Sequence, residues 1–188
     1  MAIKIFIDQG HNPENPNAGA EGNGYREQDL VYTIGEELNT LLNRNPNFEA
    51  RLSRNSPDEI LGTSTASSLR ERVSAANEWG ADYFISLHAN ASEIPTASGS
   101  EAFVYSSTSP AFPFAENILI GLHDATGLPN RGVSLRPTLY VLRATAMPAT
   151  LLELGFITNA GDAALMANNP GLFARGIYNG ILAYFGLS

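Results

Sequence analysis

The stretch DYFISLHANA, residues 82–91, decides the fold class. Residues 83–87 are mostly apolar and contain no turn residue, which is typical of a short strand buried on both faces of a sheet. The run then stops at His88, and small and polar residues follow it. Because ligands of open α/β sheets gather just beyond the carboxyl ends of the strands, His88 is well placed for chemistry.

Two other stretches repeat this design. The run IKIFIDQGH, residues 3–11, resembles a strand followed by a loop that begins near His11. The run ATLLELGFI, residues 149–157, is an apolar strand interrupted by one carboxylate, Glu153. Since burying an unpaired carboxylate is costly, we expect Glu153 to face a cation, a hydrogen-bond donor or a wet cleft. Two histidines and an acid near strand ends suggest a metal site.

Glu27 opens a predicted helix over residues 27–43 and falls on the same stripe as the apolar residues Val31 and Leu38. It therefore continues the buried face of the helix. An acid in a first helical turn also stabilises the helix macrodipole, so the position alone leaves both roles open. The Gly-, Pro- and Asn-rich loop after His11 must return to the sheet where this helix starts, which favours contact between the carboxylate and the imidazole.

The rest of the chain predicts a single α/β layered domain over residues 1–188, with about six strands and no linker or internal repeat. Besides the run that starts at residue 3, we expect strands over residues 48–53, 82–88, 101–105, 138–142 and 149–154. Besides the first helix, we expect helices over residues 69–79, 110–126, 160–167 and 171–185. Arg72, on the second helix, is expected to form a structural ion pair.

The composition narrows the function classes. The 188 residues are 44% hydrophobic and 16% charged, as in an ordinary soluble domain. The net charge of -8 and the lack of a Lys/Arg cluster argue against a nucleic-acid partner and against docking on an anionic membrane. The absence of cysteine excludes disulfides and thiolate zinc sites. No apolar run approaches the roughly 20 residues that span a bilayer.

The scattered residues form a set suited to zinc chemistry. His11, Glu27 and His88 would supply two imidazoles and one carboxylate, which leaves one zinc position for water. Calcium and magnesium are less favoured because they prefer oxygen ligands alone. A separate carboxylate must take a proton from the attacking water and pass it to the leaving group, and Glu153 is the candidate.

Four strings carry a resemblance to a known family: IDQGH at 7–11, GAEG at 19–22 followed by Glu27, ISLHANA at 85–91 and LELGFITN at 152–159. Together they resemble the zinc-dependent N-acetylmuramoyl-L-alanine amidases of the amidase_3 family, the branch of AmiC-like and CwlV-like cell-wall hydrolases. The resemblance runs in order along almost the whole chain.

This resemblance implies one zinc ion per chain, bound by His11, Glu27 and His88, and a catalytic role for Glu153. It implies hydrolysis of the amide between the lactyl group of N-acetylmuramic acid and L-alanine in bacterial peptidoglycan. It also implies a twisted, mostly parallel six-stranded sheet flanked by helices. One departure is Asn12-Pro13, where the family's first motif usually continues with glycine, which predicts a different cleft lip.

Weaker expectations concern recognition and location. The guanidinium of Arg131 could hold a stem-peptide carboxylate, although a structural ion pair is an equally good reading. We expect Asp8 and Asn90, next to the ligand positions, to support the site and not to bind the metal. Met1 leads straight into a strand, so we expect no signal peptide within this sequence. Cytoplasmic synthesis with release, as for phage endolysins or mother-cell lysis, would fit, as would an export segment outside it. We expect a monomer or a weak oligomer.

Two other functions remain open at this point. A zinc carboxypeptidase of related architecture also uses two histidines and a glutamate, but it places His and Glu in a compact His-x-x-Glu pair, whereas His11 and Glu27 lie far apart. A cell-wall-binding module without catalysis would not need all four site residues.

Overall fold

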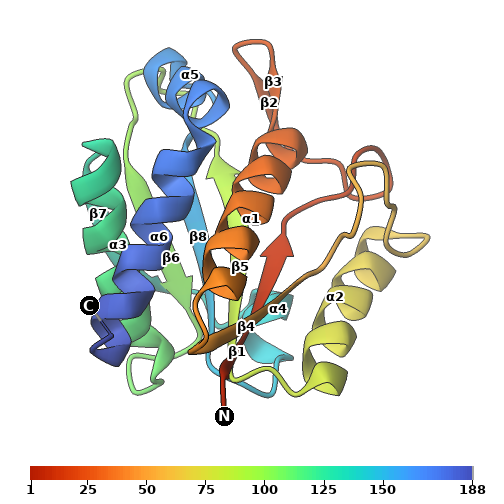
Figure 1. Cartoon of the computed structure of the whole chain (residues 1–188). Helices are drawn as coiled ribbons and strands as arrows, with labels where there is room; N and C mark the ends of the chain where they lie inside the picture. The colour runs from red at the N-terminus through yellow and green to blue at the C-terminus, as the bar shows by residue number, and fades with distance from the viewer. Residues whose placement is uncertain (188) are drawn as a thin grey trace.

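Six strands form one sheet in the order β4-β1-β5-β8-β6-β7 (Figure 1). The computed structural model describes residues 1–187. The strands are β1 (Ile3–Gln9), β4 (Phe48–Leu52), β5 (Tyr83–Asn90), β6 (Ser100–Val104), β7 (Asn130–Leu135) and β8 (Ala149–Phe156). Strands β4, β1, β5 and β8 pair in parallel, whereas β6 runs antiparallel to β8 and parallel to β7. The predicted mostly parallel six-stranded sheet is confirmed.

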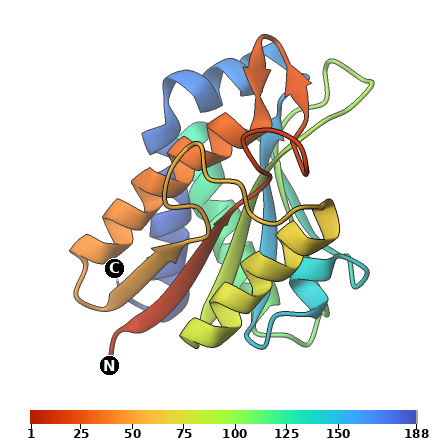
Figure 2. The same ribbon diagram turned by 90° about the vertical axis from the view of Figure 1, so that its right-hand side faces the viewer.

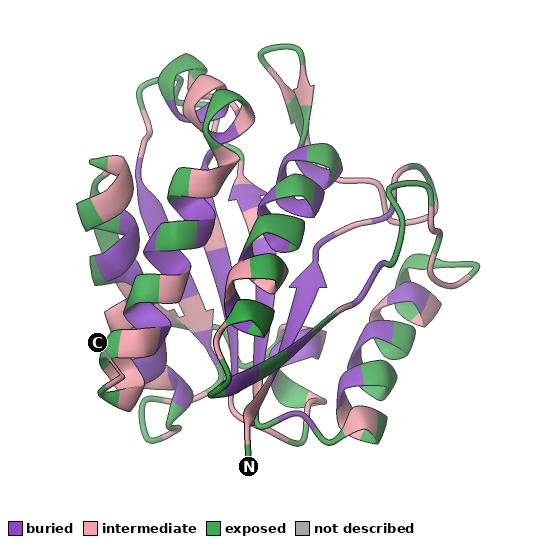
Figure 3. Ribbon diagram, viewed as in Figure 1, coloured by how far each residue is buried: buried purple, intermediate pink, exposed green. Residues whose placement is uncertain are grey.

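Helices cover both faces of the sheet (Figure 2). One layer holds the three long helices α1 (Glu27–Arg44), α3 (Ala111–Thr126) and α6 (Pro170–Phe185), with the shorter α5 (Ala160–Asn168) beside them. The other layer holds α2 (Thr65–Trp79) and the single-turn α4 (Tyr140–Arg143). Figure 3 shows that the buried residues line the strands and the helix faces turned towards them.

Alternation along the central strands divides the apolar side chains between these two layers. Ile85 and Leu87 of β5 pack in the cluster under α1, α3 and α6, whereas Phe84 packs in the cluster under α2 and α4. In β1, Phe6 likewise joins the α2 side. His88 has the same parity as Phe84, so the strand directs it towards the α2 and α4 side, at the end where β1 and β5 both finish.

The opposite end of the sheet carries both ends of the described chain. Met1 and Ala2 line one cavity together with Phe185, the last residue of α6. Figure 1 shows both termini away from the end at which the arrowheads of β1 and β5 point.

One predicted strand is wrong. Residues 138–142 were expected as a strand, but the structure forms the helix α4 at Tyr140–Arg143. A short apolar run does not distinguish a strand from a buried helical turn, and here it follows Pro137 and packs into the α2 side. The sixth strand is instead β7, whose sequence NRGVSL is at most half-buried at every position. An edge strand with a glycine and an arginine gives no alternating signal.

The long loop after β1 also contains unexpected structure. Residues 21–22 and 25–26 pair as a small antiparallel hairpin, β2 (Glu21–Gly22) and β3 (Tyr25–Arg26), which leads directly into α1. Among the residues that the structure describes, no helix has the length and apolar character that crossing a bilayer requires.

Candidate metal centre

His88 lies near the end of β5, where close backbone packing fixes its ring. A Cβ atom at Gly10 would stand 2.6 Å from Cε1 and 2.7 Å from Nε2 of the His88 imidazole. Only glycine therefore lets the end of β1 approach this ring so closely. The exposed fraction of the His88 side chain is 19%, so the ring is reachable from solvent.

His11 follows β1 in a left-handed backbone conformation, with φ of 66°. For a residue with a side chain this conformation costs about 1–2 kcal/mol, which marks a position that the surrounding structure must hold. The ring Nδ1 lies 3.3 Å from the carbonyl oxygen of Asn17. If Nδ1 donates its hydrogen to that carbonyl, the neutral imidazole presents the lone pair of Nε2 to the site.

Glu27 is the first residue of α1 and is 4% exposed. Its Oε2 accepts a hydrogen bond from the backbone N–H of Ala20 at 2.9 Å, and its Oε1 accepts one from Ala89 at 3.0 Å. A Cβ atom at Gly19 would lie 2.9 Å from both Cβ and Oε2 of Glu27, so the loop closes tightly over this carboxylate. The backbone thus holds Glu27 from two sides.

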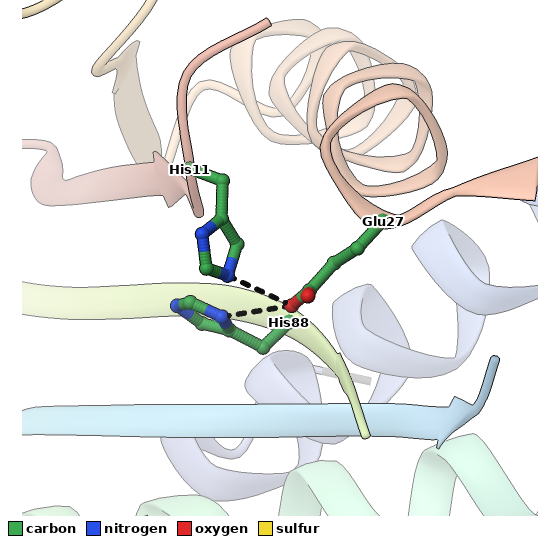
Figure 4. A group of neighbouring side chains, drawn as sticks. All are labelled: His11, Glu27 and His88. Atoms are coloured by element: carbon green, nitrogen blue, oxygen red, sulfur yellow. Dashed lines mark hydrogen bonds and ion pairs between the residues drawn. The ribbon is translucent and has the colours of Figure 1, made fainter. Parts of the chain in front are cut away.

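The three side chains meet at Oε1 of Glu27 (Figure 4). His11 Nε2 lies 3.2 Å from this oxygen and His88 Nδ1 lies 3.0 Å from it. One candidate ligand atom from each residue lies within 4.8 Å of the other two. A neutral His11 that donates through Nδ1 turns a lone pair towards a carboxylate oxygen, and such a pair of acceptors needs a proton or a metal cation between them. Two imidazoles and one carboxylate suit zinc, so the residues fit a zinc ion.

The electrostatics of the group agree with a cation site. Burial opposes ionisation of Glu27, but the hydrogen bonds and charges of His11 and His88 outweigh it and hold the pKa of Glu27 well below its ordinary value. Burial likewise lowers the pKa of His88, but Glu27 more than offsets this and raises it overall. The carboxylate is therefore ionised at neutral pH and available as a ligand.

Glu153 stands on β8 directly beside His88, its register partner on β5. Its Oε2 is buried and has no hydrogen-bond partner within the described part of the chain. Burial, together with the negative charges of Glu27 and Glu101, raises the pKa of Glu153 to about 7, although His88 opposes this shift. The sequence predicts that Glu153 faces a cation, a hydrogen-bond donor or a wet cleft; among the described residues its Oε2 faces no donor, and His88 lies beside it.

Glu101 is a neighbour to which sequence reasoning gave no role. It is the register partner of Glu153 across the antiparallel β6–β8 pair, and its Oε1 accepts a hydrogen bond from Asn90 Nδ2 at 2.6 Å. Asn90 thus supports a neighbouring carboxylate and does not join the three-residue group. Glu101 lies beside Glu153 only because β6 runs antiparallel to β8, and no local signal in the sequence reveals that direction.

Arg131 lies on the edge strand β7, separated from β8 by β6. Its guanidinium lies over the ring of Phe156 at 5.1 Å, and Nη1 donates to the carbonyl oxygen of Ser98 at 3.3 Å. The residue is exposed. No carboxylate pairs with it among the described residues, so the structure does not show the structural ion pair that was the alternative reading.

A cavity of about 140 Å³ opens beside the two imidazoles. His11, Gly10 and His88 form one side, and apolar residues of α2, β8 and the α4 region form the other: Leu69, Leu139, Val141 and Leu151. The cavity therefore lies next to two of the three grouped side chains, His11 and His88.

Comparisons with known proteins place this geometry in context. A family model described as N-acetylmuramoyl-L-alanine amidase, Amidase_3, matches residues 5–183. The N-acetylmuramoyl-L-alanine amidase CwlM of Bacillus licheniformis is 36% identical, over 99% of this chain and 70% of the relative. The sporulation-specific N-acetylmuramoyl-L-alanine amidase of Bacillus subtilis is 35% identical, over 98% and 69%. An endolysin of Bacillus phage SPP1 is 32% identical, over 88% of this chain and 59% of the relative.

Solved structures show the same similarity. The catalytic domain of CwlV, an N-acetylmuramoyl-L-alanine amidase from Bacillus (Paenibacillus) polymyxa, superposes with a TM-score of 0.85 at 32% identity and covers 99% of both chains. An N-acetylmuramoyl-L-alanine amidase from Clostridium difficile 630 gives a TM-score of 0.87 at 28% identity, over 98% of this chain and 97% of that chain.

Proposed function

The chain belongs to the Amidase_3 family of N-acetylmuramoyl-L-alanine amidases, and we infer from this membership that it is an enzyme that hydrolyses peptidoglycan. The bond cleaved is the amide between the lactyl group of N-acetylmuramic acid and the L-alanine of the stem peptide. We propose that hydrolysis requires one zinc ion per chain, held by His11, Glu27 and His88. The observation that carries this proposal is the meeting of these three side chains at one carboxylate oxygen.

The chemistry that a zinc ion supplies when bound is Lewis acidity towards the scissile carbonyl and the attacking water. The chain supplies the proton transfer. Glu153 accepts a proton from the attacking water and donates it to the nitrogen of the departing L-alanine. A carboxyl group whose pKa lies at about 7 is suited to both halves of that transfer at neutral pH. The cavity beside the imidazoles would hold the groups that flank the amide.

Mass spectrometry of the products from defined cell walls tests the activity. We expect intact stem peptides with a free N-terminal L-alanine, together with glycan chains that have lost them, and we expect a chelator to stop their release until zinc is restored. Release of single amino acids would indicate the carboxypeptidase alternative instead. No release from zinc-loaded protein would indicate a binding module.

The substrate that the family implies is bacterial peptidoglycan, so the protein must reach the cell wall. We propose that it reaches the wall by release from a lysing cell, as in phage endolysins or mother-cell lysis. The similarity to an endolysin and to a sporulation-specific amidase supports this proposal. Fractionation of the producing cells before and after lysis tests it, because an exported protein would appear outside intact cells.

We also propose that Arg131 recognises a carboxylate of the stem peptide. Its guanidinium is fixed by the Phe156 ring and the Ser98 carbonyl, yet it is exposed. We expect Arg131→Gln to raise KM for stem peptides with free carboxylates, by on the order of 10-fold for one lost charge-assisted hydrogen bond. KM for amidated peptides should change little. Equal increases for both substrates would remove the recognition role.

A further inference from the structure

The loop that carries His11 holds an unfavourable backbone conformation. His11 has φ of 66° and Asn17 has φ of 74°, both in the left-handed region that residues with side chains rarely adopt. Such conformations persist only where the surrounding contacts maintain them. The one side-chain contact between these two residues is long, at 3.3 Å from His11 Nδ1 to the Asn17 carbonyl. Other groups must therefore fix this loop.

The guanidinium of Arg72 supplies those contacts. Nη2 donates to the carbonyl oxygen of His11 at 2.6 Å and to Oδ1 of Asn12 at 3.0 Å. Nη1 donates to the carbonyl oxygen of Gln9 at 2.6 Å and to Oδ1 of Asp8 at 2.7 Å. Arg72 is 1% exposed, so water does not compete for these donors. The two terminal nitrogens of the guanidinium thus bind the chain before His11, at Gln9, and after it, at Asn12.

The same network reaches the strand that carries the second imidazole. Oδ2 of Asp8 accepts a hydrogen bond from Ser86 Oγ at 2.7 Å, and Ser86 lies two residues before His88 on β5. On its own helix, Arg72 Nε donates to Ser68 Oγ at 3.3 Å. Helix α2 is thereby connected to β1, β5 and the His11 loop through one buried guanidinium.

Asn12 completes this arrangement at the position where the sequence departs from the glycine usual in the family's motif. Its side chain is fully buried, and Nδ2 donates to the carbonyl oxygens of Pro16 at 2.7 Å and Leu61 at 3.0 Å. Its Oδ1 accepts from Leu61 N at 3.1 Å as well as from Arg72. A glycine could form none of these side-chain bonds. At this position the chain therefore carries a buried amide that ties the His11 loop to Leu61 and to Arg72 of α2.

We propose that Arg72, with Asn12, is a positioning residue for the metal centre: it holds the His11 loop so that the imidazole Nε2 faces Glu27 and the bound ion. The ion pair with Asp8 alone would need only a positive charge. The carbonyls of residues 9 and 11 and the amide of Asn12 instead use the several directed donors that arginine has and lysine lacks. This inference rests on the metal site of the proposed function.

Zinc affinity of the full chain, measured by competition with a chromogenic chelator, tests the proposal. Arg72→Lys keeps a charge for Asp8 but cannot span both carbonyls, and we expect it to bind zinc about 10- to 100-fold more weakly, the loss typical of altered support for a metal ligand. The visible spectrum of the cobalt-loaded variant should differ from that of the wild type, because the ligand geometry changes. Asn12→Ala, which leaves Arg72 in place, should weaken zinc binding on the order of 10-fold.

Gly180→Ala is the control for a general loss of stability, because Gly180 faces α3 and not the metal centre. Its zinc affinity and cobalt spectrum should match the wild type even if its Tm falls. The proposal is overturned if Arg72→Lys and Asn12→Ala bind zinc as tightly as the wild type. It is also overturned if Gly180→Ala loses zinc affinity to the same extent for the same fall in Tm. If Arg72→Lys does not fold, Asn12→Ala decides alone. A wild type that binds no zinc would instead overturn the proposed metal site itself.

Discussion

Glu153 combines a buried Oε2, which has no hydrogen-bond partner among the described residues, with a position next to His88. These properties distinguish it from Glu27, whose two oxygens are both occupied by backbone N–H groups. The structure therefore assigns the two acids different environments, one suited to permanent ionisation and one to proton exchange.

The first prediction concerns the Glu153→Gln variant. Because Glu153 is not among the three grouped side chains, we expect the variant to retain one zinc ion per chain by elemental analysis. We expect its kcat for muropeptide release to fall about 100- to 10,000-fold, the range for loss of a general acid–base group. Glu49→Gln, at an exposed position of the edge strand β4, is the matched control and should retain full activity. Substantial turnover by Glu153→Gln would refute the proton-transfer role.

The second prediction concerns pH and the metal-free protein. The pKa of Glu153 is raised from 4.5 to about 7 in the folded chain, so between these values the folded state binds more protons than the unfolded state. Stability therefore falls as pH rises through this window, by at most about 3 kcal/mol for this group. Glu153→Gln lacks this titration.

Denaturant unfolding of both chelator-treated proteins from pH 4.5 to 8 would measure the effect. The wild type should lose stability relative to Glu153→Gln as pH rises to about 7, with little further change above it. A constant difference across the range would show that the carboxyl group is not perturbed.

At the scale of the elements, glycines let the backbones of α3 and α6 pack in direct contact. A Cβ atom at Gly121 would lie 2.3 Å from the carbonyl oxygen of Gly176, and one at Gly180 would lie 2.4 Å from the Cα of Ile118. These are backbone atoms, which cannot move aside as a flexible side chain can. The absence of side chains at these positions sets the distance between the two helices.

The third prediction follows from this contact. Gly180→Ala should destabilise the protein by about 1–3 kcal/mol, since the helices must separate to admit the methyl group. Gly171→Ala, on the same helix but with open space around its Cβ, should be neutral or stabilising by up to about 1 kcal/mol. Thermal unfolding compares the two. Equal effects would mean that the helix interface tolerates the added group.

The elements also show which patterns the sequence makes visible. The helix at Glu27–Arg44 was predicted to within one residue at its end, because its apolar stripe faces a continuous buried core. The edge strand β7 was missed because none of its residues is fully buried. Its sequence therefore does not alternate between apolar and polar residues as that of a half-buried strand does. The helix α4 was misread because a four-residue helix is too short to show a helical period.

At the scale of the whole molecule, the candidate metal centre joins a loop after β1, the first turn of α1 and the end of β5. An ion bound there would cross-link three segments that are separate in the unfolded chain. Ligands that bind only the folded state stabilise it by an amount that depends on their concentration relative to Kd.

The fourth prediction is that zinc raises the thermal stability of the protein. At a free zinc concentration about 100 times Kd, the gain is about 2.7 kcal/mol, which corresponds to a Tm increase of roughly 5–10 °C for a chain of this size. His11→Ala should lose most of this increase, and zinc per chain should fall by elemental analysis. An increase of the same size in His11→Ala would place the ion elsewhere.

The sequence predicted which residues meet, but not how they are held. His11, Glu27 and His88 could be grouped because each lies where a strand ends or a helix starts, and the parallel sheet brings such points to one edge. The supporting contacts could not be predicted in the same way. The bonds from Arg72 to the carbonyls at residues 9 and 11 depend on a rare backbone conformation, and the approach of Glu101 to Glu153 depends on one reversed strand.

Both ends of the described chain lie at the end of the sheet opposite the candidate metal centre, where Met1 and Phe185 line the same cavity. A tether attached at either end would leave the cavity beside His11 and His88 on the side of the protein away from the point of attachment. Immobilisation on a bead, or fusion to another module through a flexible spacer, should therefore keep the cavity accessible to an insoluble polymer, and a tether at the start of α2, near Leu69 in the cavity lining, should obstruct it.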